Sequence, residues 1–445
     1  MSDTVNDPTV LPVRRNRAER RHRARAAMAA GSAAVLASAA GGAVMTFSGG
    51  VAGATATDVT NCNDSGVGSL RDAVANAQTN VGPDTITITA ECTASSPVAV
   101  GSVMEVTEDD LTIVGPGADQ FVLDGGDAHQ VFHVDMTGDF SLSGVTIQHG
   151  LSGGGGSGGG GAIRIASAGT VTIRNVVFDS NATIYSGGAL YIDSATDVTI
   201  TNSVFSNNTA YNGGATYLIY DDGDTVISNS TFVGNEATDS GGAITIYEHP
   251  GTFTLANSTI TGNTAGNRGA AVWGAGLYTD GTFVFNTFAD NEGGSDDGID
   301  FVDRQDTNLT FAGNIVASAD DGTVVTVESS VPVVSDHNDF FGQVAGFTPD
   351  ATDLDVDPQL EALADNGGPT PTRALAATSP VIDQGPTGWP TFTGDAFDQR
   401  GTPYVRSYHG ATDIGAYEVQ PDPEPTPGPT PEPTPEPTPE PSFTG

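Results

Sequence analysis

Aspartates are the residues of this chain that are best placed to do chemistry. They form two groups that are each close together in sequence: Asp221, Asp222 and Asp224 in the first, and Asp296, Asp297, Asp300, Asp303 and Asp306 in the second. Two or three carboxylates that converge on a groove, roughly 5–10 Å apart, could hydrolyse a glycosidic bond. Oxygen-rich loops could instead hold Ca²⁺. No Asp-x-Asp-x-Asp-Gly loop repeats, so we expect solvated turns, with Ca²⁺ at Asp296, Asp297 and Asp300 as the alternative and no other cofactor.

Basic residues restrict the chemistry further. The chain contains no Lys, and its 15 basic residues are all Arg. A polysaccharide lyase, which cleaves by elimination, needs a base, usually Lys or Arg, beside Ca²⁺ or another group that neutralises charge. In the central part of the chain only four Arg could serve: Arg164, Arg174, Arg268 and Arg304.

A repeat must position whatever site exists. An aromatic or aliphatic residue is followed three positions later by Asn, at Phe178/Asn181, Phe205/Asn208, Phe232/Asn235, Ile260/Asn263 and Phe288/Asn291. These phrases recur every 27 or 28 residues and alternate with Gly-Gly-Ala steps that begin at Gly187, Gly213 and Gly241, with Gly269-Ala270 as a weaker copy. A fixed period of this length indicates stacked repeats. Apolar and polar residues alternate between the phrases, which favours strands.

The period predicts the fold. About 27 residues fit three short strands and three bends, because strands are usually about five residues long. One such coil cannot bury its apolar face alone, whereas stacked coils can, each strand pairing in parallel with its copy about 4.8 Å away. We therefore predict an all-β, right-handed parallel β-helix with three strands per coil.

Two columns of Asn follow from this stacking. The first is Asn181, Asn208, Asn235 and Asn263, and the second is Asn175, Asn202, Asn229 and Asn257, continued at Asn286 and Asn314. Asn can bond to the identical residue above and below it and tolerates left-handed backbone. We expect both columns to be internal structural ladders. The Gly-Gly steps are expected to be tight corners with positive φ, and the run from Gly153 to Gly161 is expected to be a flexible loop that leaves the wall.

The N-terminal part predicts export and a cap. Residues 1–56 contain a basic stretch, an Ala-rich apolar run and a small-x-small site, which is typical of a signal peptide. Residues 57–97 form a cap segment, with apolar residues spaced for one short helix within residues 68–77 and with Ser69 as its N-cap. In an exported protein the two cysteines, Cys62 and Cys92, are most simply a disulfide.

The remaining chain divides into three parts. Residues 98–316 are the coils, residues 317–420 lose the period, and residues 421–445 are a Pro-rich, disordered linker. The net charge of −40 argues against nucleic acid as a partner, because an acidic surface repels phosphates. No transmembrane helix is expected in the mature chain, since no other apolar stretch approaches about 20 residues.

Several motifs resemble known families. The repeated phrases resemble the polymorphic outer membrane protein repeat of the right-handed parallel β-helix group. Residues 68–73 resemble a Cys-Ser-Leu-Arg-Glu-Ala segment, from which Gly68 and Asp72 depart. Residues 363–370, 379–385, 398–401 and 413–418 resemble the choice-of-anchor Q domain. Together the resemblances cover most of residues 61–419. They imply an exported protein held at, or released from, a bacterial surface, and no particular reaction.

The last motif contains charged residues that could pair. Arg is scarce in this chain, and its bidentate pairing with carboxylates fixes geometry. We expect pairing across loops that seal the last coil, among Arg400, Arg406, Asp383, Asp398, Asp413 and Glu418. The alternative is a carboxylate–Arg site for sugar.

The predicted function is a non-catalytic, secreted or cell-surface protein that presents an extended face to an extracellular glycan, a cell wall or another cell surface. The alternative is a polysaccharide lyase or glycoside hydrolase of the pectin-lyase-like superfamily, although the Asn-Thr-Asp and Gly-His-Gly steps of polygalacturonases are missing. Some aromatic residues could stack on sugars, but most are expected to pack within the coils: Tyr185, Tyr191, Tyr211, Tyr217, Tyr220, Tyr247 and Trp273. Among the histidines, only His129 and His133 have a spacing that would suit a metal.

Overall fold

The computed structural model describes residues 56–79, 82–107, 109–153, 158–276, 280–294, 298–302, 308–318, 322–328, 331–389, 392 and 396–420. They belong to one compact unit, Ala52–Gly445. The expected signal peptide, apart from Ala56, and the expected linker 421–445 lie outside the described residues.

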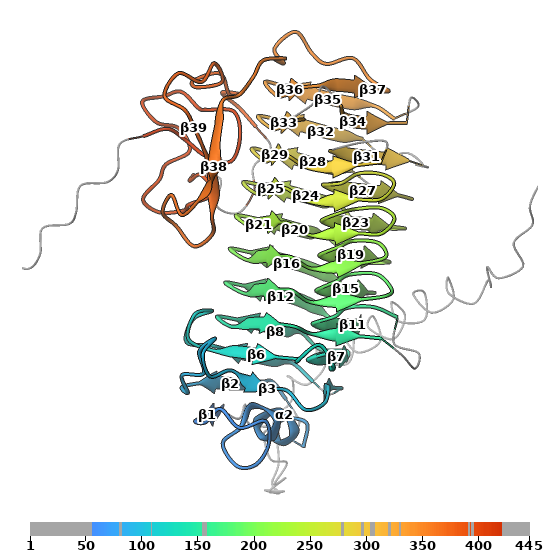
Figure 1. Ribbon diagram of the computed structural model, residues 1–445, viewed down its shortest axis with the longest axis vertical. Coiled ribbons are helices and arrows are strands. Elements are labelled where there is room, and N and C mark those ends of the chain that lie inside the picture. The colour runs from blue at the N-terminus through green and yellow to red at the C-terminus, as the bar shows by residue number, and fades with distance from the viewer. Residues whose placement is uncertain are drawn as a thin grey trace, which may run out of the picture. The chain divides into compact units, whose positions relative to one another are not determined.

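The described residues form an all-β, right-handed parallel β-helix, as predicted from the repeat (Figure 1). Three long parallel sheets make up its walls. The strands of the first sheet are β1 Ala56–Val59, β2 Asp84–Ile88, β5 Leu111–Val114, β8 Phe140–Ser143, β12 Thr170–Arg174, β16 Asp197–Thr201, β20 Thr225–Ser228, β24 Phe253–Ala256, β28 Gly281–Val284, β32 Leu309–Ala312 and β35 Val333–Asp336.

The strands of the second sheet are β4 Met104–Val106, β7 Phe132–Asp135, β11 Ile163–Ser167, β15 Leu190–Asp193, β19 Thr216–Ile219, β23 Ile244–Tyr247, β27 Val272–Ala275, β31 Ile299–Val302, β34 Thr323–Val327 and β37 Gln343–Ala345. The strands of the third sheet are β3 Val98–Ala99, β6 Val122–Asp124, β9 Thr146–Gln148, β13 Val177–Asp179, β17 Val204–Ser206, β21 Thr231–Val233, β25 Thr259–Thr261, β29 Thr287–Ala289, β33 Ile315–Ala317 and β36 Asp339–Phe341.

Equivalent side chains lie directly above one another. Phe178 pairs in register with Phe205, and Phe205 with Phe232. Their buried rings stack with centroids 4.8 and 4.6 Å apart. The period of the sequence is therefore the period of the stack, and the central side chain of each third-sheet strand faces the core.

A fourth short ladder adds to the predicted three strands per coil. It consists of two-residue strands: β10 Leu151–Ser152, β14 Ala182–Thr183, β18 Thr209–Ala210, β22 Glu236–Ala237, β26 Thr264–Ala265 and β30 Glu292–Gly293. Two residues are too few for alternation to be recognised in a sequence.

The Gly-Gly corners have positive φ at their first glycine, for example 72° at Gly187. The expectation that Gly153–Gly161 is a loop that leaves the wall is wrong for its last two residues. Gly160 and Gly161 form one more corner in the wall, and the Gly160 N–H donates to Gly187 O at 3.0 Å. The Gly-Gly-Ala phrase therefore begins one coil earlier, at Gly160-Gly161-Ala162, where it is hidden within a longer glycine run.

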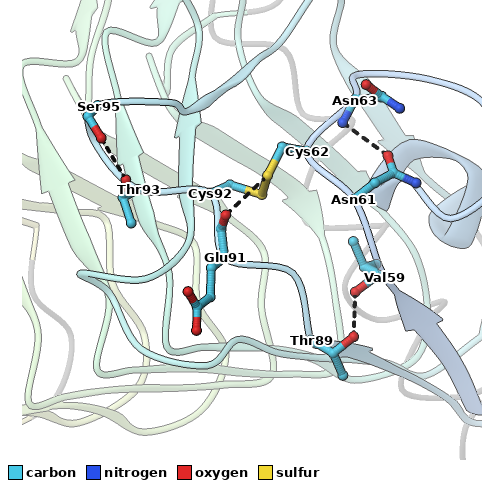
Figure 2. The surroundings of a disulfide bond; sticks show 9 residues. All are labelled: Val59, Asn61, Cys62, Asn63, Thr89, Glu91, Cys92, Thr93 and Ser95. Carbon is cyan, nitrogen blue, oxygen red and sulfur yellow. Dashed lines mark hydrogen bonds between the residues drawn. A yellow bond between two sulfur atoms is a disulfide. The ribbon is translucent and has the colours of Figure 1, made fainter.

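A helix and a disulfide occupy the N-terminal end. The helix α2, Leu70–Ala77, begins after Ser69, whose hydroxyl accepts a hydrogen bond from the Asp72 N–H at 3.2 Å. Its Leu70, Ala73, Val74 and Ala77 side chains are buried. Cys62 and Cys92 form a disulfide beside it, with Cα atoms 5.6 Å apart (Figure 2). Together these features cover the apolar end of the first coils.

Residues 360–420 form what we call the C-terminal module. Within the ranges that the structure describes, it contains the antiparallel pair β38 Leu360–Ala364 and β39 Thr372–Leu375, and otherwise turns and loops. It lies beside the third sheet rather than within the stack (Figure 1).

Candidate functional site

The first Asn column is a continuous buried ladder. The Oδ1 atoms of Asn208, Asn235, Asn263 and Asn291 each accept from the main-chain N–H and the side-chain amide of the Asn one coil before, beginning with Asn181. Asn181 Oδ1 accepts from the Gly150 N–H at 2.8 Å. Each side-chain amide also donates to a main-chain carbonyl, as Asn208 does to Phe178 O at 3.1 Å. The column satisfies the polar groups of the bend and is not available to a ligand.

The second Asn column is in fact two columns, which corrects the sequence interpretation. Asn175, Asn202, Asn229 and Asn257 share left-handed backbone, with φ of 51°, 52°, 52° and 47°. They are not bonded to one another by their side chains among the described residues.

Asn286 and Asn314 belong to the neighbouring column. There the Asn286 amide donates to Asn314 Oδ1 at 3.0 Å, and Ser258 occupies the position before them. The sequence carried this distinction, because Asn257 precedes its Ile260 by three residues whereas Asn286 precedes its Phe288 by two.

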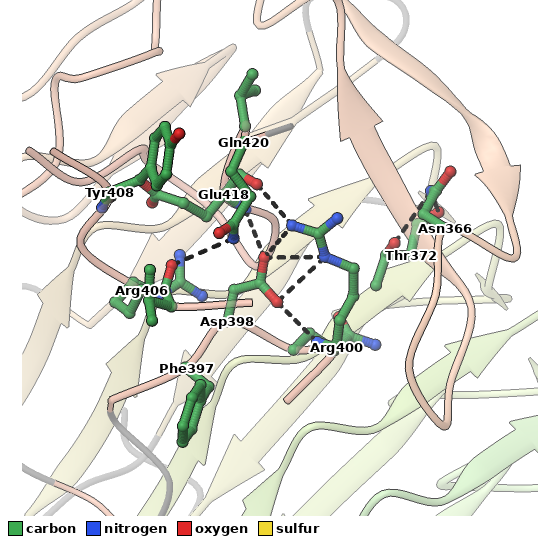
Figure 3. A network of polar contacts seen from close by, with 12 residues as sticks. Asn366, Thr372, Phe397, Asp398, Arg400, Arg406, Tyr408, Glu418 and Gln420 are labelled. Carbon is green, nitrogen blue, oxygen red and sulfur yellow. Dashed lines mark hydrogen bonds and ion pairs between the residues drawn. The ribbon is translucent and has the colours of Figure 1, made fainter. Parts of the chain in front are cut away.

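Asp398, Arg400, Arg406 and Glu418 (Figure 3) form a buried network with Asp413. Asp383, which was also expected to pair, is exposed, and its main-chain N–H donates to Asp413 Oδ1 at 2.8 Å. Arg400 pairs with Asp398, at 2.6 Å between Nη2 and Oδ2, and its guanidinium lies over the ring of Tyr404, 3.8 Å from the centroid. The Glu418 carboxylate accepts from the N–H groups of Tyr408 and Asp413. Because these groups bind main chain and each other, they hold the loops of the module together, which favours the structural role over a sugar site.

Burial changes the proton affinity of this network. The pKa of Glu418 is raised to about 8, first because of its burial and then because of the nearby Asp413 charge. Burial also raises the pKa of Asp413 and lowers that of Arg406. Arg406 donates to the carbonyls of Gly415 and Ala416.

The module covers the flank of the coils, whereas sequence reasoning placed these pairs over the last coil. Thr231 and Thr259 point outward from adjacent strands of the third sheet. Thr231 donates to Pro371 O at 2.6 Å, and Thr259 to Gln399 Oε1 at 2.6 Å. Further along, Ile315 packs with Leu375, Val381 and Ile414. Long-range docking of this kind leaves no periodic signal in a sequence.

A groove of about 420 Å³ remains open on the same sheet, next to the module. The outward side chains of Thr146, Val177 and Val204, which are in register on three successive coils, line it. Asn175 and Asn202, from the bends that precede β13 and β17, line it as well. The three open coils span roughly 10 Å, two steps of about 4.8 Å.

Loops border this groove at both ends. Ala118 and Asp119 lie at one end, where the Thr146 hydroxyl donates to Ala118 O at 2.6 Å. Pro369 of the C-terminal module lies at the other end. Asp119 is the only carboxylate in the lining, so the residues that border the groove supply amides, apolar methyl groups and a single negative charge.

The groove was not predicted from the sequence, although its two Val positions stand out there. The outward residue before each core residue changes from Val to Thr along the chain, from Val177-Phe178 and Val204-Phe205 to Thr231-Phe232 and Thr259-Ile260. The change coincides with the coil at which the C-terminal module begins to cover the sheet, but Thr at this position does not by itself identify a covered coil, because Thr146 also lines the open groove.

Neither acidic cluster forms a site in the described part of the chain. Asp296, Asp297, Asp303 and Asp306 lie outside the described residues. Asp300, a calcium candidate, lies within strand β31, is fully buried and has Arg268 at 3.8 Å. Among the described residues, no group of three or more His, Cys, Asp or Glu side chains is arranged to hold a metal ion.

Asp221 of the first cluster is buried beside a histidine. Its Oδ2 lies 4.0 Å from Nε2 of His249, and both side chains are inaccessible to solvent. His249 Nδ1 lies 2.8 Å from Gly251 O, and its Nε2 lies 3.0 Å from the Thr225 hydroxyl. Burial raises the pKa of Asp221 and lowers that of His249. Since a substrate cannot reach either group, they act in the structure of the bend.

Six of the seven aromatic residues singled out in the sequence divide into two sets, and the seventh, Tyr220, is partly buried with φ of 57°. Tyr191, Tyr217, Tyr247 and Trp273 stack on successive coils of the second sheet, with neighbouring centroids 5.4 to 6.4 Å apart. Tyr185 and Tyr211 are exposed on adjacent coils. His129 lies in a turn before β7 and His133 within it, where His133 Nδ1 is 2.7 Å from Glu105. The two histidines therefore do not share a strand.

None of the helices in the described ranges has the length and apolar character that crossing a bilayer requires. Comparison with curated proteins finds no relative of this chain. Residues 130–279, which include the groove-lining strands β9, β13 and β17, match the family model described as a right-handed β-helix region.

Proposed function

We propose that this protein is an exported binding protein that holds a neutral glycan of a cell wall or cell surface in the groove over β9, β13 and β17, without performing chemistry on it. The observation that carries the proposal is the groove itself, bordered at both ends by loops and lined by amide and apolar groups. Such a lining offers hydrogen bonds and apolar contact in an open cleft.

The charge of the protein supports a neutral ligand. A net charge of −40 repels polyanions, which include acidic polysaccharides. Export is supported by the Cys62–Cys92 disulfide, because disulfides persist mainly in oxidising compartments, and by the signal-like composition of residues 1–56.

The experiment is isothermal titration calorimetry of the purified protein against a panel of neutral and acidic oligosaccharides. We expect heat of binding with at least one neutral oligosaccharide. Val204→Arg places a long charged side chain in the groove and should abolish that binding. Val334→Arg is the matched control, since Val334 is 57% exposed on β35 of the first sheet.

Two outcomes would overturn the proposal. One is the absence of binding to every member of the panel, or binding that Val204→Arg leaves intact. The other is the release of reducing or unsaturated sugar ends when the protein is incubated with the same glycans, with or without Ca²⁺, which would favour the lyase or hydrolase.

A further inference from the structure

The left-handed Asn column donates to peptide carbonyl groups where the C-terminal module covers it, and Asn257 Oδ1 also accepts from Arg406 at 2.7 Å. Asn229 donates from Nδ2 to the main-chain carbonyls of Asp398 and Gln399, both at 3.3 Å. Asn257, one coil further, donates from Nδ2 to Phe397 O at 2.8 Å. Two successive coils thus present the same donor, on the same backbone conformation, to amide carbonyls of the C-terminal module.

The outward strand positions beside this column also bind an amide. The side chain of Gln399 lies against Thr231 and Thr259. Its Nε2 donates to the Thr231 hydroxyl at 2.9 Å, and its Oε1 accepts from Thr259 at 2.6 Å. Gln399 is fully buried, so the molecule itself places a carboxamide on this face.

The two preceding coils carry the same Asn donors, but there no described residue of the C-terminal module bonds to them. Asn175 and Asn202 line the groove, and no hydrogen bond joins their side-chain amides to the residues that the structure describes. The outward positions beside them are Val177 and Val204 in place of the two Thr. This half of the column therefore pairs amide donors with apolar methyl groups.

An acetamido group matches that pairing. It combines a carbonyl oxygen, which accepts from an Asn amide, with a methyl group, which gains from contact with Val. We propose that the groove recognises the acetamido groups of an N-acetylated neutral glycan, with Asn175 and Asn202 donating to their carbonyls and Val177 and Val204 contacting their methyls. This inference rests on the proposed function and adds the ligand class.

The test compares two glycans that differ only in this group. Chitohexaose carries an acetamido group on every sugar, whereas cellohexaose has a hydroxyl there. We expect calorimetry to give a Kd for chitohexaose about tenfold lower or more, the equivalent of one net hydrogen bond. Equal affinity for both would overturn the acetamido assignment and leave glycan binding standing, whereas failure of all the oligosaccharides would remove both.

Two variants test whether Asn175 and Asn202 recognise the acetamido groups. Asn175→Gly with Asn202→Gly deletes both amides and keeps the positive φ, which glycine adopts without strain. We expect this double variant to lose the preference for chitohexaose. Asn207→Gly is the control, because Asn207 also has positive φ, 56°, on a neighbouring bend but donates to Asp179. A preference that survives in the double variant contradicts the inference.

A peptide is the competing source of amide groups. A neutral Gly-Gln hexapeptide is included in the same titrations, and we expect it to bind more weakly than chitohexaose. Tighter binding of the peptide overturns the assignment to a glycan.

Discussion

The side-chain amide of Asn208 donates a 2.9 Å hydrogen bond to Oδ1 of Asn235, one coil further along, and both side chains are fully buried. Oδ1 of Asn208 in turn accepts from the N–H and the side-chain amide of Asn181. Each Asn therefore has its side-chain groups satisfied only while its neighbours are present.

Replacement of Asn208 by Ala should be severely destabilising. It leaves several buried donors and acceptors without partners, each costing about 1–3 kcal/mol. We expect the free energy of unfolding, measured by urea denaturation, to fall by about 3 kcal/mol or more. Asn267→Ala, at an exposed position whose amide bonds to Asp239, should change it by less than about 0.5 kcal/mol. Equal effects at the two sites would contradict the role of the ladder.

The Gly-Gly corners should be sensitive to a methyl group for two separable reasons. Gly213 and Gly126 both have φ of 61°. A Cβ at Gly213 would collide with the carbonyl oxygen of Thr216, whereas a Cβ at Gly126 meets open space. We expect Gly126→Ala to cost about 1–2 kcal/mol from the left-handed backbone alone.

Gly213→Ala should cost clearly more than that, because the backbone of the corner must also move. Thermal unfolding of the two variants, with the midpoints compared, measures the difference. If Gly213→Ala is no more destabilising than Gly126→Ala, the corners are less tightly packed than the structure indicates.

Glu418 should make the protein less stable as the pH rises. Its pKa in the folded protein is raised to about 8 by burial, whereas its ordinary value is 4.5. Between those values the folded state binds a proton that the unfolded state releases, so stability declines as pH rises from about 4.5 to about 8. Calorimetric unfolding temperatures recorded from pH 5 to pH 9 should show the decline.

Glu418→Gln resembles the protonated residue in shape and does not titrate. We expect it to flatten the decline, whereas Glu361→Gln, at an exposed position, should leave it unchanged. A variant with the slope of the original protein would show that the pH dependence arises elsewhere.

His249 should cause a loss of stability in acid. Burial lowers its pKa below the ordinary 6.5, because the charged ring would lie among buried groups. As the pH falls below 6.5 the unfolded state takes up a proton before the folded state does, and the free energy of unfolding decreases. The raised pKa of Asp221 acts in the opposite direction over the range above 3.8.

The contribution of His249 is measured from the change in unfolding free energy between pH 7 and pH 5. Glu418 and Asp221 favour the folded state as the pH falls over this interval, so each variant is compared with the original protein. From pH 7 to pH 5, His249→Gln should lose less unfolding free energy, or gain more, than the original protein, whereas His337→Gln, at a partly exposed bend, should behave as the original does. An unaltered acid response in His249→Gln contradicts this assignment.

The fold could be predicted from the sequence because both are periodic. The Phe178, Phe205 and Phe232 phrases repeat every 27 residues, and nothing but a stacked coil places such residues in contact. The site was harder to predict. Asn175 and Asn229 look identical in sequence and have the same φ, yet one is open and the other lies under Asp398, which is more than 160 residues away. Only the docking of the C-terminal module distinguishes them, and such docking depends on contacts that no local pattern encodes.

The loop at Ala118 and Asp119 and the loop at Pro369 stand on the same wall of the coil stack, separated by whole coils. Inserting or deleting one 27-residue repeat between Val204 and Thr231 would move these two stops apart or together by about 4.8 Å while leaving every contact of either stop in place. The length of polymer that fits between the two loops would therefore change in steps of about 4.8 Å, one step for each repeat that is gained or lost, without any change to either loop.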